Sequence, residues 1–392
     1  MNNISNIKSC YGCGVCIISC GKKIIEIRID ENGFYAPFIT EKSACVNCGI
    51  CVDVCAFCHN DLAVNNSPIA SYAGWSKEPG VRQVSASGGV GFEISRKAID
   101  EGYKVVVVRY NVEENRAEHY IAYTEQDLLP SMGSKYIQSY TLNGFKFIDR
   151  RNKYLITGTP CQIDSFRRYI KRFKCEDNFI LMDFFCHGVP SKIIWDKYFK
   201  YIEHIAGEIK NASFRNKQNG WHDSWIMSFD GKNGEGESTD WQDSFNLKIK
   251  EHKYFINNRA TQGDLFYSMF LGNNCLGKAC YKNCKYKYNH SSADIRIGDL
   301  WGETYKKEEK GVTACVAFTQ KGKELLNESN CELIEHPFEI VAEGQIKQAM
   351  RYPAFTRWLI LNLAKCNFVN IKSLAIINRL SNGICRRLKI PS

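Results

Sequence analysis

Two runs of four cysteines constrain this chain more than any other part of its sequence. The first run contains Cys10, Cys13, Cys16 and Cys20, and the second contains Cys45, Cys48, Cys51 and Cys55. Both runs have the spacing C-x2-C-x2-C-x3-C. Only 19 of the 392 residues are cysteines, so chance seldom produces one such run and hardly ever produces two.

The spacing is that of bacterial ferredoxins, in which each run gives three thiolates to one 4Fe-4S cluster and its fourth to the other. Two-residue gaps let three sulfurs curl around one cube, and the fourth cysteine is predicted to start a helix that carries its sulfur away. Gly12, Gly14 and Gly49 fit because the backbone must approach the inorganic core closely. The expected ligand sets are Cys10, Cys13, Cys16 and Cys55 for the first cube, and Cys45, Cys48, Cys51 and Cys20 for the second.

Two other uses of cysteine explain the pattern less well. A structural zinc ion takes four ligands from two C-x2-C pairs, which leaves half of these cysteines without a role. A disulfide scaffold requires a secretory context, and the N-terminus has no apolar signal region. A zinc-binding interaction protein is kept as the weaker alternative.

Composition limits the class of protein further. A chain of 392 residues with a net charge of +10 has room for two or three domains. Its basic residues are interleaved with acidic ones, which predicts a solvated surface and no nucleic-acid site. No apolar run approaches the length of a transmembrane helix. These features predict a soluble cytoplasmic protein, and they leave its oligomeric state open.

Strand and turn signals predict how the chain is organised. Lys23–Asp30 and Phe34–Ile39 alternate like strands on either side of Asn32-Gly33, so the cysteine module holds a hairpin. After a linker near Asn66, Ser87 is predicted to cap a helix that ends near Glu101, followed by the apolar strand Val105–Val108. Ser85, Ser87, Gly88 and Gly89 form a glycine-rich helix start of the kind that holds phosphate or a flavin edge.

Strand, loop and helix then recur twice. Tyr154–Thr157 leads into Gly158, Thr159 and Cys161, and Phe179–Phe185 leads into Cys186 and His187 before a helix capped by Ser191. Loops at the carboxyl ends of such strands are where ligands bind in α/β sheets. The polar stretch 211–245, with Trp221, Trp225 and Trp241, is interpreted as an irregular insertion. The predicted fold is an α+β ferredoxin-like dicluster domain followed by an α/β flavin- and iron-sulfur-binding domain.

Taken together, these motifs resemble the beta-subunit family of coenzyme F420 hydrogenase and dehydrogenase. The resemblance rests on the cysteine runs, the Ser85–Gly89 stretch, the loops at Cys161 and Cys186, and Cys275–Cys284 running into Asp294–Gly302. It implies bound FAD and a third 4Fe-4S cluster supplied from Cys161, Cys186, Cys275, Cys280 and Cys284. A cube needs four of these five cysteines, and Cys275 is the plausible surplus. Three residues separate Cys280 from Cys284, whereas the usual spacing of this pair in the family is C-x2-C. The flavin would be lined by Ser87–Gly89, Lys135 and Thr157–Thr159.

The resemblance implies an oxidoreductase that transfers electrons between a hydride carrier, coenzyme F420 or a related molecule, and the clusters through FAD. His187 is the candidate proton donor or acceptor, unless it only orders its loop. An electron-delivery subunit that reduces a partner enzyme or organic substrate without coenzyme F420 is the alternative. Either function requires a redox partner protein or subunit. The expected domains are residues 1–66, 67–150, 151–345 and a helical basic tail, 346–392.

Overall fold

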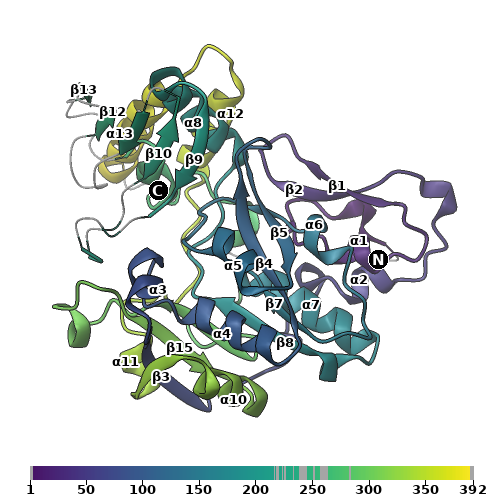
Figure 1. The fold of residues 1–392 in the computed structure, drawn as a ribbon. Coiled ribbons are helices and arrows are strands. Elements are labelled where there is room, and N and C mark those ends of the chain that lie inside the picture. The colour runs from purple at the N-terminus through teal and green to yellow at the C-terminus, as the bar shows by residue number, and fades with distance from the viewer. Residues whose placement is uncertain are drawn as a thin grey trace.

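A nine-stranded mixed sheet forms the centre of the computed structural model (Figure 1). The structure describes residues 3–388 apart from 216, 218, 219, 223, 225, 226, 233, 238–244, 250, 251, 257–263, 282 and 283. The strand order is β16-β3-β15-β14-β8-β7-β4-β5-β6. Strands β14, β8, β7 and β4 run parallel in the middle, and antiparallel pairs flank them. The expected α/β layering is therefore correct in its parallel centre, whereas both flanks of the sheet contain antiparallel pairs.

The bounds of the regular elements follow. The strands of the large sheet are β3 (Ala70–Ser76), β4 (Lys104–Asn111), β5 (Arg116–Ala122), β6 (Ser139–Tyr140), β7 (Tyr154–Thr157), β8 (Phe179–Phe184), β14 (Ile295–Asp299), β15 (Thr313–Ala317) and β16 (Cys331–Glu335). Three smaller sheets contain β1 (Ile25–Ile29), β2 (Tyr35–Ile39), β9 (Ile209–Ser213), β10 (Ser228–Gly231), β11 (Gly234–Glu237), β12 (Phe245–Ile249) and β13 (His252–Ile256). The helices are α1 (Val15–Ile18), α2 (Ile50–Asp53), α3 (Pro79–Val84), α4 (Val90–Asp100), α5 (Glu125–Leu128), α6 (Leu142–Phe145), α7 (Pro160–Arg172), α8 (Lys192–Ala206), α9 (Tyr267–Phe270), α10 (Gln320–Glu328), α11 (Phe338–Val341), α12 (Ala354–Lys365) and α13 (Ile371–Arg387).

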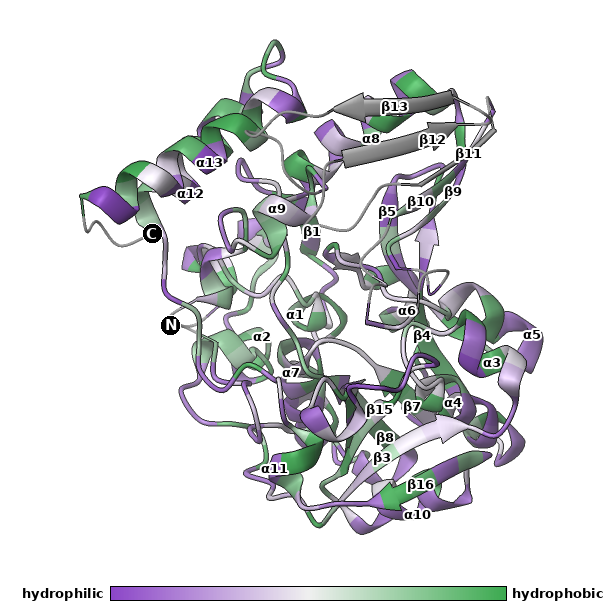
Figure 2. Cartoon of the chain, turned by 90° about the vertical axis from the view of Figure 1, so that its left-hand side faces the viewer, coloured by the Kyte–Doolittle hydropathy of each residue, from purple (hydrophilic) through white to green (hydrophobic). Residues whose placement is uncertain are grey.

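Helices cover both faces of the sheet because its central strands are apolar on both sides. Val105 and Val107 pack in one core with residues of α4 and α10. Val106, between them, packs in the opposite core with α6 and α7. Figure 2 shows β4 and β15 as largely hydrophobic strands within the molecule. This arrangement brings the carboxyl ends of β7, β8 and β14 to one edge of the sheet.

The N-terminal cysteine module docks on this sheet. Its β1–β2 hairpin confirms the predicted strands, and Val15 and Val54 enter the core beneath α7. The buried side chain of Gln138 fastens the module by donating to the carbonyl of Tyr11 at 3.2 Å and accepting from the amide of Tyr35 at 2.8 Å. A Cβ on Gly12 would collide with that side chain. The contact therefore requires glycine on one side and a long amide on the other.

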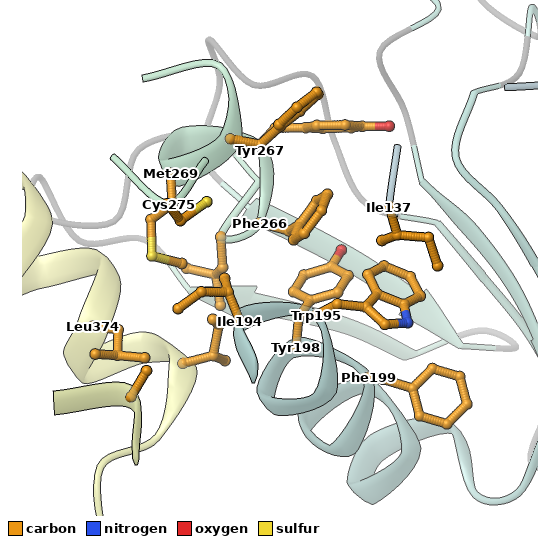
Figure 3. Packing of buried hydrophobic residues seen from close by; sticks show 14 of the residues in the cluster. Ile137, Ile194, Trp195, Tyr198, Phe199, Phe266, Tyr267, Met269, Cys275 and Leu374 are labelled. Carbon is orange, nitrogen blue, oxygen red and sulfur yellow. The ribbon is translucent and has the colours of Figure 1, made fainter. Parts of the chain in front are cut away.

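A further aromatic core joins α8, α9, α12 and α13, and Ala117 of β5 and Tyr110 of β4 connect it to the large sheet. Trp195 and Tyr198 of α8 pack there against Phe266, and Leu374 of α13 closes the other side (Figure 3). The Ser191 hydroxyl accepts from the amide of Ile193, which confirms the predicted cap of α8. Among the described residues, no helix combines the length and the apolar character that crossing a bilayer requires.

Two predictions of local structure are wrong. Ser87 does not cap α4, because Gly89 occupies the N-cap position with a φ of 89° and the Ser87 hydroxyl donates instead to the carbonyl of Val312 at 2.7 Å. The fourth cysteines do not start α-helices either, because Cys20 follows α1 and Cys55 precedes only the three-residue 3-10 helix Ala56–Cys58. Helices α1 and α2 begin just before the third cysteine, where left-handed Gly14 and Gly49 turn the chain. Trp225 and Trp241 of the predicted insertion lie outside the described residues.

Candidate redox site

The two cysteine runs exchange their last members. Cys10, Cys13 and Cys16 of the first run line a narrow cavity together with Cys55 of the second. Burial, together with the charges of neighbouring thiolates, raises the pKa of Cys10 to about 12 and that of Cys13 to about 11. Thiols that are buried and lie close to one another stay protonated unless a cation or a metal cluster compensates the charge of their thiolates.

The second group of cysteines lies nearer the surface. Burial raises the pKa of Cys51, and Cys20 and Cys48 are the neighbouring thiols that add to this effect. Asn3 donates to the Cys45 sulfur at 3.5 Å. Cys48 is exposed. The structure thus places Cys20 of the first run among members of the second, as the spacing predicts.

Cys58 is a member of this region that the sequence reasoning missed. A hydrogen bond with Cys58, together with burial, raises the pKa of Cys55, and the same bond lowers the pKa of Cys58. The only signal in the sequence is the two-residue gap between Cys55 and Cys58. The Cys55 thiol therefore acts as the donor and stabilises negative charge on the sulfur of Cys58.

A third group of cysteines meets at the end of the sheet. Cys161 lies in the first turn of α7, Cys186 follows β8, and Cys280 and Cys284 come from the loop after α9; all four line one small cavity. Burial raises the pKa of Cys186 to about 12 and that of Cys280 to about 11. Cys10 of the first run lines the same cavity.

Cys275 does not belong to this group. Its side chain is fully buried in the aromatic core, between α8 and α13 (Figure 3). Its carbonyl accepts the Ser191 amide at 2.8 Å. Within the described part of the chain, no group of three or more His, Cys, Asp or Glu residues, the three cysteine groups included, is close enough to hold a single metal ion.

A much larger cavity, of about 510 Å³, adjoins the third group of cysteines. It lies at the carboxyl ends of β7, β8 and β14, the edge where ligands bind in parallel sheets. Of the predicted flavin residues, the following line it: Ser85, Ser87, Gly89, Lys135, Thr157, Gly158 and Thr159. His187 lines it as well.

Gly88 is the exception among the predicted flavin residues. It packs against β3 and β15, where a Cβ would collide with the carbonyl of Gly74, and its amide donates to the Thr313 hydroxyl at 2.9 Å. The amides of Gly158 and Thr159 are also occupied, by the Met182 carbonyl at 3.2 Å and the Gln162 side chain at 2.8 Å. These two amides are therefore not free to bind a phosphate group.

Backbone donors remain at the start of α4. The amides of Gly89, Val90 and Gly91 have no hydrogen-bond partner in the described residues. They belong to the first turn of an 11-residue helix, where the helix dipole adds a partial positive charge. This is the part of the cavity best suited to an anionic group.

Lys135 organises its own loop. Its ammonium donates to four carbonyls, those of Pro130, Ser131, Met132 and Gly133, at 2.7 to 3.2 Å. Burial lowers the pKa of Lys135 to about 7, while the four carbonyl acceptors favour its charged form. Lys135 lines the cavity, and its ammonium ties together the carbonyls of the loop that forms the cavity wall.

His187 lies at the boundary between the large cavity and the cysteine group. Its ring meets Phe270 edge to face with centroids 4.9 Å apart, and its Nε2 has no hydrogen-bond partner in the described residues. Burial and the charge of Lys287 lower the pKa of His187 to about 4, so the ring is neutral near pH 7. Lys287 donates to the carbonyls of Cys186 and His187 at 2.6 and 2.9 Å.

The cavities form a continuous series. The large cavity and that of the third group share Thr159, Cys186, Tyr286 and Lys287 among their lining residues. The cavity of the third group in turn shares Cys10 and Tyr11 with that of the first group. A group bound in the large cavity would therefore be separated from Cys10 by the third group of cysteines alone.

Behind Asp299 and Trp301, which line the large cavity, lies a cation that the sequence did not single out. Arg215 is fully buried and forms an ion pair with Asp299 at 2.7 Å. Trp221 stacks on Trp301 with centroids 4.7 Å apart and donates to Asp299 at 3.1 Å. Arg215 carries no recognisable motif, because the sheet brings it to Asp299 from 84 residues away.

Comparison with known proteins agrees with this architecture. Residues 71–145 match the N-terminal family model of the coenzyme F420 hydrogenase/dehydrogenase beta subunit, and residues 151–337 match the C-terminal model of the same family. These matches define an oxidoreductase. The chain belongs to the coenzyme F420 hydrogenase/dehydrogenase beta-subunit family.

No curated protein sequence matches the chain. Among solved structures it is similar to a chain of the F420-reducing NiFe hydrogenase complex from Methanosarcina barkeri, at 15% identity and a TM-score of 0.46. That match covers 84% of this chain and 95% of the other.

Proposed function

We propose that this oxidoreductase is an iron-sulfur flavoprotein that transfers electrons between a hydride carrier, coenzyme F420 or a related molecule, and 4Fe-4S clusters by way of FAD. The observation that carries the proposal is the series of adjoining cavities. The large one is of a size that holds cofactors, at about 510 Å³. The next is lined by Cys161, Cys186, Cys280 and Cys284 together with Cys10, and the last by Cys10, Cys13, Cys16 and Cys55, so each contains the four thiols that a cube requires.

The residues present fit a flavin in the large cavity. The free amides of Gly89, Val90 and Gly91 suit a phosphate group, and Lys135 and the loop of Thr157–Thr159 form walls. When bound, FAD supplies the step between two-electron hydride chemistry and one-electron transfer.

Each cluster would be held by four thiolates. We assign Cys10, Cys13, Cys16 and Cys55 to the first, and Cys20, Cys45, Cys48 and Cys51 to the second. The third takes Cys161, Cys186, Cys280 and Cys284, and Cys275 is not a ligand. Because burial raises the pKa of Cys10 and Cys186, cluster insertion must release protons at these sites.

His187 and Lys287 would act between the flavin and the third cluster. The Nε2 of His187 is unpaired within the described residues and so is placed to exchange the proton that accompanies a hydride, and because the pKa of the ring is about 4 the ring would pass that proton on and not hold it. Substitution of His187 by Ala is expected to slow flavin reduction. An unchanged rate would mean that His187 only orders its loop.

Electrons would leave or enter at the second cluster. Its ligand Cys48 is exposed, and Val46 beside it is 64% exposed. A partner protein or subunit that carries single electrons could therefore approach this cluster closely. The large cavity on the other side of the series is left for the small hydride carrier.

The test is anaerobic purification followed by flavin and iron analysis, and then a screen of electron donors. Reduced coenzyme F420, reduced nicotinamides and low-potential dyes are each mixed with the protein while flavin bleaching is recorded. Bleaching by the reduced deazaflavin supports the proposal. Bleaching by dyes alone favours the electron-delivery alternative. Protein that neither contains nor takes up FAD contradicts the proposal.

A further inference from the structure

A separate cleft of about 320 Å³ lies between the N-terminal module and the C-terminal helices. One side is the β1–β2 turn, represented by Asp30, Glu31 and Phe34, and the other is Tyr352 and α12. Both sides lie outside residues 71–145 and 151–337, which match the family. The cleft is therefore built mainly from parts of the chain that those matches do not cover.

Arg357 of α12 is the central cation of this cleft. It is only 8% exposed, and its Nε donates to the Leu276 carbonyl at 2.8 Å. Its two terminal nitrogens have no hydrogen-bond partner in the described part of the chain. A buried guanidinium whose two terminal nitrogens are free can bind a carboxylate or a phosphate through two parallel hydrogen bonds.

Aromatic rings surround this guanidinium. Its Cζ lies 5.8 Å from the ring centroids of both Phe34 and Tyr352. Trp358, the next residue of α12, lines the cleft and is 61% exposed. Flat apolar walls beside a cation suit a planar ligand with a single anionic group.

The charges lining the cleft favour an anion. Lys278 and Lys365 are exposed at its edge and add to Arg357. Of the two acidic residues, Asp30 accepts the amides of Asn32 and Phe34 at 2.9 and 3.0 Å and so is committed to its turn. Glu31 remains as the single exposed acid.

Cys10 also lines this cleft, as it lines the cavities of the first and third groups of cysteines. We infer that the cleft binds a small planar carboxylate against Cys10. Binding in the cleft does not depend on the proposed function. The further claim that the ligand would lie beside the first cluster does rest on that function.

The test uses benzoate as the planar carboxylate and inorganic phosphate as a bare anion, each titrated calorimetrically into anaerobically purified holoprotein. Benzoate is expected to bind saturably and phosphate more weakly. Arg357→Met should weaken benzoate binding by about tenfold or more, because a charged bidentate contact is lost. Arg379→Met, on the exposed surface of α13 outside the cleft, should bind like the wild type.

A second variant guards against misfolding. Lys365→Glu changes an exposed residue at the edge of the cleft and should also weaken benzoate binding, with an unchanged melting temperature. If phosphate bound as tightly as benzoate, the inference that the cleft prefers a planar ligand would be overturned. Benzoate binding unaffected by both substitutions, or no saturable binding, would overturn it entirely.

Electron paramagnetic resonance separates this inference from the proposed function. In the wild type, benzoate should perturb the signal of the cluster held by Cys10, and in Arg357→Met it should not. Arg357-dependent binding to protein without cluster signals would uphold the cleft and reject the clusters. Cluster signals in protein that does not bind benzoate would uphold the clusters and reject the cleft.

Discussion

The rings of Tyr11 and Tyr286 meet edge to face with their centroids 5.8 Å apart. Tyr11 belongs to the first cysteine run, and Tyr286 lines both the large cavity and that of the third cysteine group. The Tyr286 hydroxyl donates to the buried carboxylate of Asp164 at 2.9 Å. The pair therefore joins the N-terminal module to the sheet at the point where the cavities adjoin.

Substitution of Tyr286 by Phe should lower the free energy of unfolding by about 1–2 kcal/mol, because Asp164 loses a donor in a buried site. Denaturant titration of the anaerobic protein measures this change. Tyr123→Phe, at an exposed tyrosine, should have almost no effect. Equal stability of the two variants would show that Asp164 does not depend on this hydrogen bond.

Substitution of Cys20 by Ser should damage the cluster assigned to Cys45, Cys48 and Cys51, although Cys20 follows the first run in sequence. The reason is that Cys20 is a neighbour of Cys51 in the folded chain. Electron paramagnetic resonance of the reduced protein distinguishes the clusters. Cys175→Ser, outside all three groups, serves as the control. Damage confined to the cluster of Cys10 would contradict the exchange of ligands.

Substitution of Cys186 by Ser should reduce the iron content from about twelve to about eight atoms per chain, counting four per cube. Cys275→Ser should retain about twelve, because Cys275 lies in the aromatic core away from the other four. Iron analysis of both variants decides the ligand set. Iron loss in the Cys275 variant with none in the Cys186 variant would reverse the assignment.

Acid should destabilise the protein through His119. Burial lowers the pKa of this fully buried ring to about 4, and its Nε2 bonds the Thr157 carbonyl at 3.1 Å. Below about pH 6.5 the unfolded chain binds a proton that the folded chain excludes, so stability falls as pH falls towards 4. Between pH 7.5 and 5.5 the contribution is about 1 kcal/mol.

His119→Gln should flatten this part of the pH dependence, as measured by denaturant titration at each pH. His204→Gln, at an exposed position of α8, should leave the slope unchanged. A slope that persists in the His119 variant would assign the effect to other groups.

Local patterns predicted the features that depend on near neighbours. The hairpin around Gly33, the cap at Ser191 and the sharing of Cys20 and Cys55 between runs all follow from short spacings. The sequence analysis also expects Cys275 to be the surplus thiol of the third group, and in the structure it lies apart from the other four. The structure supplies the reason, which is its burial between α8 and α13.

Features that depend on distant segments could not be predicted. Ser87 is a good cap by composition, but its hydroxyl finds the Val312 carbonyl across the sheet. Gly88 resembles a phosphate-binding glycine and instead allows close packing against Gly74. Arg215 reaches Asp299 only after the sheet has formed. In each case a long-range contact decides the role of a residue whose local sequence suggests another.

The hydrogen bonds of Gln138 affect how the rate of electron transfer inside this protein depends on protein concentration. A free electron carrier must collide with its acceptor for every transfer, so the rate depends on the concentrations of both proteins. Here Gln138 holds Tyr11 and Tyr35 of the cysteine module against the body of the same chain. Transfer between the two would be unimolecular, and dilution would leave its rate unchanged.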